Sequence, residues 1–314
     1  MRVLFTFNIK EDQLRSLEMG FPNTEFSFTK NIEDVPLDSY EIIVTYGEDI
    51  TPSVLDRAPS LKWIMVASAG VEKMPLDVIA EKGIIVSNVR GIHKTPMAES
   101  VLAHILSLGR ALPTLREQQE RKEWNMKVKQ TELRGSTALI LGPGAIGSEI
   151  GRLLNAFGVY TIGCNSSGDR AQFMDETIPF DQLKEVLPKA DIVISILPST
   201  QETKGMLDDS YFKLMKNTAL FMNFGRGDLV KESTLVHALK HGEIGHAVLD
   251  VFEKEPLPAE SELWELGNIT ISPHVSSHSG KYVERAMEFF TENLSKWQQN
   301  DRELLNLINL KKGY

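Results

Sequence analysis

From residue 3 to about residue 95, short apolar runs alternate with segments of helical periodicity. The apolar runs cover residues 3–7, 41–45, 62–67 and 83–87, and we expect each of them to form a β-strand. Strands separated by helical patterns are typical of βαβ units, in which neighbouring strands run parallel. This part of the chain is therefore predicted to be α/β.

A second α/β pattern follows a strongly apolar helix, which we expect at residues 97–112. About thirty residues of charged, irregular sequence separate this helix from the next apolar run. Further strands are expected at residues 159–164, 191–197, 219–223, 247–251 and 269–272, and a final helix from Lys281 to the C-terminus. The regular alternation predicts a doubly wound parallel sheet.

Gly142, Gly144 and Gly147 lie between an apolar strand and an amphipathic helix, in the spacing GxGxxG. In such a unit the first glycine permits a tight turn and the second lets the backbone approach a pyrophosphate. The third lets the helix and the strand pack closely. Ala145 and Ile146 open the helix, whose free N–H groups favour an anion. We interpret the turn as a dinucleotide-binding site; the alternative is a merely tight strand-to-helix turn.

Composition narrows the class of protein. The 314 residues fit two domains, and 42% hydrophobic and 25% charged residues are ordinary for a globular chain. A net charge of -9 with mixed acids and bases argues against nucleic acid and membrane surfaces as partners. The single cysteine, Cys164, excludes an internal disulfide and a multi-cysteine metal site. No apolar run has the length of a signal peptide core or a membrane span, so we expect a cytoplasmic protein. We expect no bound metal.

An arginine, a carboxylate and a histidine follow three of the predicted strands. Arg226 comes after the strand at 219–223, Glu255 after the next strand and His274 after the last. The carboxyl ends of parallel strands form the rim where ligands bind, so these side chains are expected to converge beside a cofactor. Each alone could satisfy a local turn, but their complementary chemistry favours a catalytic set.

This ordered series resembles the D-isomer-specific 2-hydroxyacid dehydrogenases, the family of D-lactate, glyoxylate/hydroxypyruvate and D-3-phosphoglycerate dehydrogenases. The resemblance spans most of the chain. Its motifs are Leu133-Arg134-Gly135, the glycine turn, Ala190-Asp191-Ile192-Val193 with Leu197-Pro198, Glu202-Thr203-Lys204-Gly205, Asn223-Phe224-Gly225-Arg226-Gly227, Asp250-Val251-Phe252 with Glu255-Pro256, and Pro273-His274.

The resemblance implies a Rossmann cofactor domain at residues 98–280, inserted in a flavodoxin-like substrate domain at residues 1–97 and 281–314, with a cleft between them. It also implies a homodimer, NAD(P)H as the cofactor and a small 2-keto or 2-hydroxy acid as the substrate. The further cofactor-binding residues that it implies are Leu197, Pro198, Phe224, Gly225 and Asp250.

Reduction of a 2-keto acid needs a hydride at C2, a proton for the carbonyl oxygen and an anchor for the carboxylate. The resemblance makes Arg226 the anchor, since a planar guanidinium suits bidentate carboxylate recognition. His274 would donate the proton in reduction and accept it in oxidation, because imidazole titrates near neutral pH. Glu255 would bind the other ring nitrogen and favour the imidazolium.

A glycine turn near the N-terminus is a second candidate for substrate binding. Ser68, Ala69, Gly70 and Val71 follow a predicted strand and resemble the family loop whose backbone N–H groups bind the substrate carboxylate. The alternative is an ordinary strand-to-helix turn. Glu72 stands where the family often has aspartate.

The choice between NAD and NADP depends on the end of the second strand of the cofactor domain. An NAD-preferring domain places an acid there, and this chain has Asn165 followed by Ser166. A neutral loop would not repel a 2′-phosphate, and Arg170 could reach one, so we hypothesise a preference for NADPH. Asp169 could swing in and oppose it.

The loop at residues 44–50 carries Glu48 and Asp49 and no basic residue. Two acids would repel a phosphorylated substrate, although Arg90 or Lys94 could compensate. We therefore expect glyoxylate, hydroxypyruvate or another small 2-keto acid as substrate.

Two other functions compete with this one. Some relatives are dinucleotide-sensing corepressors with little turnover, but this chain has no basic or disordered recruiting tail. A methyltransferase could use GxGxxG to bind S-adenosylmethionine, yet Arg226, Glu255 and His274 would have no role there.

Overall fold

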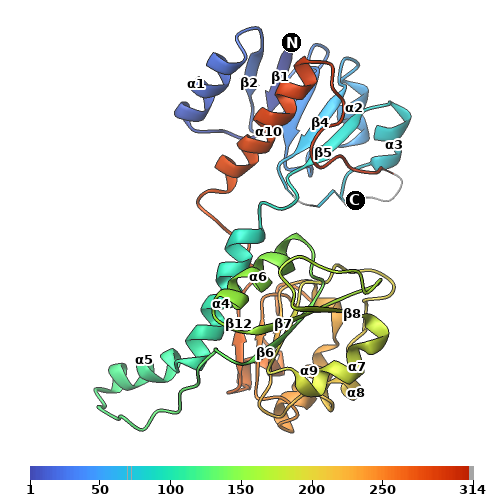
Figure 1. The fold of residues 1–314 in the computed structure, drawn as a ribbon. Helices are drawn as coiled ribbons and strands as arrows, with labels where there is room; N and C mark the ends of the chain where they lie inside the picture. Colours follow the sequence, from blue (N-terminus) through green and yellow to red (C-terminus); the bar gives the residue numbers. More distant parts are fainter. Residues whose placement is uncertain (69, 72, 311–314) are drawn as a thin grey trace. The chain divides into compact units, whose positions relative to one another are not determined.

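The structure is a computed structural model that describes residues 1–68, 70–71 and 73–310. They form two compact units, each with its own parallel sheet (Figure 1). The first unit comprises Met1–Ile92 and the chain from Ser279 onward, and the second unit is His93–His278. The expected substrate domain at residues 1–97 and 281–314 and the expected cofactor domain at residues 98–280 stay predictions.

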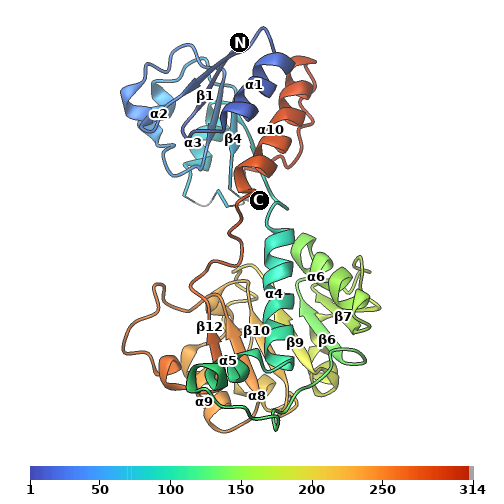
Figure 2. The ribbon, with the colours of Figure 1, turned by 90° about the vertical axis from the view of Figure 1, so that its left-hand side faces the viewer.

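The first unit has the strand order β2-β1-β3-β4-β5, which is the 2-1-3-4-5 order of flavodoxin-like sheets. Helices α1 and α10 cover one face, where Phe5, Trp63 and Phe290 pack together, and they lie side by side in Figure 2. Helices α2 and α3 cover the other face. The elements are β1 (Arg2–Phe5), α1 (Glu11–Gly20), β2 (Glu25–Phe28), η1 (Ile32–Asp34), β3 (Ile42–Thr45), α2 (Pro52–Asp56), β4 (Trp63–Val66), α3 (Leu76–Glu81), β5 (Ile85–Asn88) and α10 (Tyr282–Gln298).

The second unit has the order β12-β11-β10-β9-β6-β7-β8, a Rossmann sheet with β12 added beyond β11. Helices α4 and α6 cover one face, and α7, α8 and α9 cover the other. Its helices are α4 (Lys94–Gly109), α5 (Leu112–Arg121), α6 (Ala145–Ala156), α7 (Leu183–Val186), α8 (Asp209–Phe212) and α9 (Glu232–Lys240), with short 3-10 turns η2 (Phe180–Gln182), η3 (Leu187–Lys189), η4 (Gly227–Leu229) and η5 (Glu262–Glu265). Its strands are β6 (Thr137–Leu141), β7 (Tyr160–Asn165), β8 (Glu176–Pro179), β9 (Ile192–Ser195), β10 (Leu220–Asn223), β11 (His246–Leu249) and β12 (Ile269–Ile271).

The predicted fold class of two parallel α/β sheets, one Rossmann and one flavodoxin-like, is confirmed, but three details of the helices were wrong. The helix expected at 97–112 ends at Gly109, because Ala111 adopts a left-handed φ of 53°. The charged stretch that follows is not irregular throughout, since it begins with the helix α5, which projects away from the sheet of its unit (Figure 1).

The last helix also ends earlier than expected. It stops at Gln298, and Asn300 then turns the chain with a φ of 60°. The chain returns to the sheet of the first unit, where Leu307 bridges Ser87 and the Ile308 N–H donates to the Val86 carbonyl at 2.9 Å. The strand residues that form these contacts lie far from the helix in the chain, so helical periodicity alone did not locate its end.

Candidate active site

The glycine turn after β6 meets each geometric requirement of a pyrophosphate site. Gly142 has a φ of +88°, and its N–H donates to the Cys164 carbonyl of β7 at 2.9 Å. A Cβ on Gly147 would lie 2.5 Å from the Gly142 carbonyl oxygen, so α6 packs against the turn. A Cβ on Gly144 would meet nothing within 4 Å. The space above the start of α6 is thus open to an anion, which the unpaired N–H groups of the first helical turn would bind.

The loops after β9 and β10 touch through their backbones, at the carboxyl ends of both strands. A Cβ on Gly225 would lie 2.4 Å from the Leu197 carbonyl oxygen. Ser195, the last residue of β9, accepts the Phe224 N–H at 3.0 Å. Leu197, Pro198, Phe224 and Gly225 therefore lie together at the sheet edge where Rossmann sheets bind their ligand.

Arg226 lies on a turn that a buried asparagine holds. The Asn223 side chain accepts the Gly225 N–H at 3.2 Å and donates to the Arg226 carbonyl at 3.0 Å. The guanidinium itself is exposed, and its one hydrogen bond within the described part of the chain runs from Nη1 to the Gly225 carbonyl at 3.0 Å. Most of its donors thus remain available to a ligand. A positioning role of Asn223 was not predicted from the sequence.

The structure joins His274 to Glu255 and joins Glu255 to the loop after β11. His274 Nδ1 lies 2.8 Å from Glu255 Oε2, and Glu255 Oε1 accepts the Phe252 N–H at 2.9 Å. A Cβ on Gly227 would lie 1.9 Å from the Phe252 carbonyl oxygen, so the loop that carries Arg226 packs on the same residue. Among the described residues, Nε2 of His274 has no hydrogen-bond partner.

Asp250 is buried, 1% exposed, at the end of β11. Its carboxylate accepts hydrogen bonds from Ser272 Oγ at 2.5 Å, from the Val275 N–H at 3.0 Å, and from the N–H and hydroxyl of Ser276. These donors flank His274, which has a strained φ of 54°. Asp250, expected to bind cofactor, thus holds the loop of the histidine; its contact with a cofactor stays a prediction.

The loop after β7 is built around the Asn165 side chain. Its amide accepts the N–H groups of Ser167 and Gly168, at 3.2 and 2.6 Å, and donates to the Asp169 carbonyl at 2.9 Å. Ser166 and Arg170 are exposed. Asn165 therefore shapes the loop, and the exposed side chains nearby are the ones available to a ligand.

In the first unit, the loops after β3 and β4 line one pocket of about 160 Å³. Ser68, Gly70 and Val71 belong to its wall, and the Ser68 hydroxyl donates to the Gly70 carbonyl at 3.0 Å. Ala69 and Glu72 lie outside the described residues. The opposite wall is Tyr46, Gly47 and Glu48, with Lys73 and Met74 completing it. The candidate carboxylate loop and the candidate specificity loop are therefore neighbours.

The charge of that specificity loop differs from the expectation. Lys73 Nζ lies 2.7 Å from Glu48 Oε1, and Thr45 donates to the Asp49 carboxylate. The Lys73 ammonium lowers the pKa of Glu48, and Glu48 raises the pKa of Lys73. Both acids of the loop therefore have partners. Lys73 was not expected beside them because it lies outside residues 44–50.

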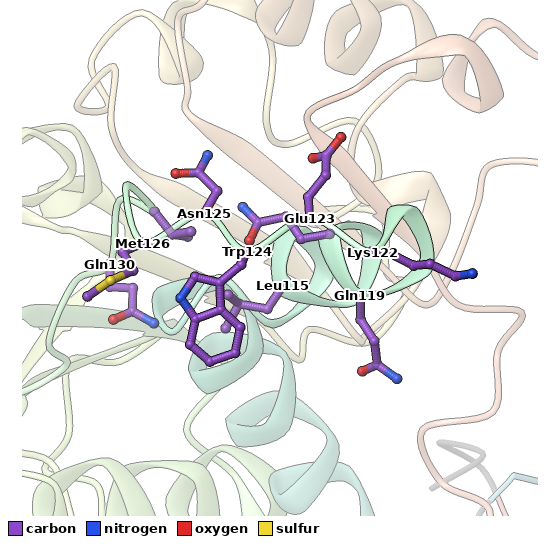
Figure 3. Close-up of a pocket in the computed structure, with 10 residues that line it drawn as sticks. Leu115, Gln119, Lys122, Glu123, Trp124, Asn125, Met126 and Gln130 are labelled. Carbon is purple, nitrogen blue, oxygen red and sulfur yellow. The ribbon is translucent and has the colours of Figure 1, made fainter.

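A hollow of about 610 Å³ is lined by α5 and the segment after it, with Leu115, Trp124 and Met126 in its wall (Figure 3). No group of three or more His, Cys, Asp or Glu side chains within 1–68, 70–71 and 73–310 could hold a metal ion. No helix in this part of the chain is long and apolar enough to cross a membrane; the cytoplasmic location stays a prediction.

A Rossmann sheet, a glycine turn open to an anion and a histidine held by a carboxylate define a nicotinamide-dinucleotide-dependent oxidoreductase. The family model described as D-isomer specific 2-hydroxyacid dehydrogenase, NAD binding domain, matches residues 102–276. The chain belongs to the D-isomer specific 2-hydroxyacid dehydrogenase family. This membership excludes the methyltransferase alternative.

Three similar proteins illustrate the family. D-3-phosphoglycerate dehydrogenase of Methanocaldococcus jannaschii is 31% identical over 94% of this chain, which spans 57% of that relative's length. A crystal structure of a D-isomer specific 2-hydroxyacid dehydrogenase family protein from Aeromonas salmonicida is 33% identical, with a TM-score of 0.85 over 98% of this chain and 99% of that one. An NADPH-dependent glyoxylate/hydroxypyruvate reductase from Sinorhizobium meliloti, solved with NADP and sulfate, is 25% identical, with a TM-score of 0.80 over 100% and 99%.

Proposed function

We propose that this protein interconverts a small 2-keto acid and the D-2-hydroxy acid, with NAD(P)H as the hydride donor. The observation that carries the proposal is the Glu255–His274 pair, 2.8 Å apart, on the strand-end rim that also bears Arg226. The residues of the glycine turn fit a dinucleotide, since the space above Gly144 is open and the helix N-terminus points donors into it. When bound, the nicotinamide supplies the hydride.

The side chains of this chain supply binding and proton transfer. His274, protonated at both ring nitrogens, donates its Nε2 proton to the carbonyl oxygen as the 2-hydroxy acid forms. Glu255 accepts the Nδ1–H hydrogen bond at 2.8 Å and thereby fixes the orientation of the ring. Arg226 binds the substrate carboxylate with its free guanidinium donors. In the first unit, the backbone N–H groups of Ser68, Gly70 and Val71 would donate to a substrate carboxylate.

The test follows the absorbance of NADPH or NADH with glyoxylate, hydroxypyruvate, pyruvate, longer 2-keto acids and phosphohydroxypyruvate. His274→Asn is the informative variant, because asparagine tolerates the positive φ at this position while lacking the acid. We expect kcat to fall by at least about a hundredfold. His278→Asn, at an exposed position of the same segment, is the matched control. Unchanged turnover in His274→Asn, or none in the wild-type protein, contradicts the proposal.

Arg226 is tested by Arg226→Lys, which keeps the positive charge and loses the bidentate fork. We expect KM for the 2-keto acid to rise about tenfold or more, because a lysine cannot pair with both carboxylate oxygens in one plane. A rise in the KM of the dinucleotide alone would instead assign Arg226 to the cofactor.

We also propose a preference for NADPH. The neutral Asn165 side chain is used within its own loop, and Ser166 and Arg170 are exposed beside it. The similar Sinorhizobium meliloti reductase was solved with NADP. Arg170→Ala should raise KM for NADPH while leaving KM for NADH unchanged. Equal or better kcat/KM with NADH in the wild-type protein would remove this preference.

As substrate we propose an unphosphorylated 2-keto acid of the size of glyoxylate or hydroxypyruvate. A pocket of about 160 Å³ beside Ser68, Gly70 and Val71 supports a small substrate. Higher kcat/KM with phosphohydroxypyruvate than with every unphosphorylated acid would overturn this choice. The alternative of a dinucleotide-sensing protein with little turnover has no support in the comparisons, and the same assay tests it.

We propose a homodimer formed through α5 and the segment after it. Trp124 and Met126 are 94% and 87% exposed, and the hollow beside them is the one in Figure 3. Exposed apolar patches of this kind mark contact surfaces between proteins. Sedimentation should give a dimer that Trp124→Ser weakens. A strict monomer at micromolar concentration contradicts the proposal.

A further inference from the structure

The pocket of the first unit lies where two strands end, and a glycine fits its two walls together. Gly47, after β3, has a φ of +96°, and a Cβ on it would lie 3.2 Å from Met74 Sδ. Its N–H donates to Thr45 Oγ1 at 2.9 Å. The loop that bears Glu48 is therefore held against the segment that bears Lys73.

One cation lines this pocket among the described residues, and it is already paired. Lys73 Nζ and Glu48 Oε1 are 2.7 Å apart, and the two side chains are 76% and 71% exposed. Asp49, the other acid of the loop, accepts a hydrogen bond from the Thr45 hydroxyl instead of reaching the lysine. At neutral pH the two charges of the Glu48–Lys73 pair cancel.

We propose that Glu48 pairs with Lys73, keeps its ammonium from binding another anion and thereby selects substrates with a single negative charge. The inference rests on the proposed function and names its substrate class: 2-keto acids whose side chain carries no carboxylate or phosphate. A second anionic group on the substrate would need Lys73 as its partner, and it would have to displace a carboxylate tethered 2.7 Å away. The tether gives Glu48 an effective concentration that a free ligand does not match.

The pair does not hinder the 2-keto acid carboxylate itself. That group binds backbone N–H donors of the Ser68–Val71 segment in the proposed function, and Lys73 is the side chain that a second charge would seek. A pair with no net charge neither attracts nor repels a neutral side chain such as the hydroxymethyl group of hydroxypyruvate.

Glu48→Gln is the decisive variant, because it frees Lys73 while preserving the size of the side chain. We compare kcat/KM for oxaloacetate, 2-oxoglutarate and phosphohydroxypyruvate with kcat/KM for glyoxylate and hydroxypyruvate. The kcat/KM for substrates with a second anionic group, divided by the kcat/KM for singly charged substrates, should rise about fivefold, as expected for one exposed ionic contact. The rise should shrink in high salt, since exposed charges are screened. Adding Lys73→Gln to Glu48→Gln should cancel the rise.

Asp56→Asn is the matched control. It breaks the Asp56–Lys82 ion pair of the same unit, 2.9 Å long and outside the pocket lining, and should leave the substrate ratio unchanged. An unchanged ratio in Glu48→Gln, or an equal rise in Asp56→Asn, would overturn the inference and leave the Glu48–Lys73 pair as a structural contact between two loops.

A binding experiment separates this inference from the proposed function. The dissociation constants of oxamate, which carries one negative charge, and of 2-oxoglutarate, which carries two, are measured by calorimetry for the wild-type protein and Glu48→Gln without any dinucleotide. Tighter binding of 2-oxoglutarate, but not of oxamate, supports the inference even where no turnover is found. Equal dissociation constants in both proteins refute it, whatever the turnover.

Discussion

The three glycines after β6 have three different physical requirements. Gly142 needs a positive φ, Gly147 needs the absence of a Cβ for packing, and Gly144 has an ordinary φ of -76° with open space beside it. A side chain at Gly144 is therefore compatible with folding, and it would fill the space in which we propose that the dinucleotide binds. Folding and cofactor binding can thus be separated within one turn.

Gly147→Ala and Gly144→Ala form a matched pair for this argument. Gly147→Ala should lower the free energy of unfolding by about 1–3 kcal/mol, because its Cβ would overlap the Gly142 carbonyl oxygen. Gly144→Ala should change it by less than about 0.5 kcal/mol and weaken dinucleotide binding. Urea unfolding and titration with NADPH measure the two effects. Normal dinucleotide affinity in Gly144→Ala would place the pyrophosphate elsewhere.

At the scale of elements, β11 controls the loop that follows β12. Asp250 directly follows β11 and accepts hydrogen bonds from Ser272, Val275 and Ser276, which surround His274 in the chain. A buried carboxylate is stable only when such donors compensate for its lost hydration. The same donors fix the backbone of a histidine in a strained conformation, so Asp250 is a positioning residue for the proposed acid.

Asp250→Asn should therefore act through the loop. Its amide group presents donors to N–H and hydroxyl groups that need acceptors, at a cost of about 1–3 kcal/mol. We expect kcat to fall and the amides of Val275 and Ser276 to exchange hydrogen faster, with little change in the KM of the substrate. Unchanged exchange together with weaker dinucleotide binding would assign Asp250 to the cofactor instead.

For the molecule as a whole, three half-buried histidines make stability depend on pH. Burial lowers the pKa of His93. Burial lowers the pKa of His104 on α4, which Asp250 partly opposes. Burial, and then the charge of His104, lower the pKa of His246 on β11. His246 Nε2 also lies 3.0 Å from Thr270 Oγ1. The folded protein therefore binds fewer protons at these sites than the unfolded chain, whose histidines titrate near pH 6.5.

The direction of the pH dependence of stability follows from this difference in the number of bound protons. The stabilising contribution is complete above about pH 6.5 and is lost as the pH falls toward the lowered folded values. We expect Tm to fall between pH 7.5 and pH 5.5, and to fall less in His104→Gln and least in the double variant with His246→Gln. Calorimetry at matched ionic strength measures it. A double variant whose Tm falls as steeply as that of the wild-type protein contradicts this origin.

Short-range patterns predicted the strands that are buried on both faces, and at the edges of the sheets they found β12 but not β2 or β8. β3, β4 and β9 are fully buried and read as continuous apolar runs. The edge strands β2 and β8 are half exposed and were missed, because their mixed residues lack a clear period. α5 was missed for a related reason, since none of its residues is buried.

The residue types of the candidate site could be predicted from the chain because each follows a strand, and parallel strands place their carboxyl ends on one edge. Arg226, Glu255 and His274 were found in this way. The contacts between separate segments could not be predicted from the sequence. Asp250 and Val275 are 25 residues apart in the chain, as are Glu48 and Lys73, and each pair meets only when strands align in register. Local chemistry is written in short segments, whereas hydrogen bonds and ion pairs between segments depend on packing that no short segment contains.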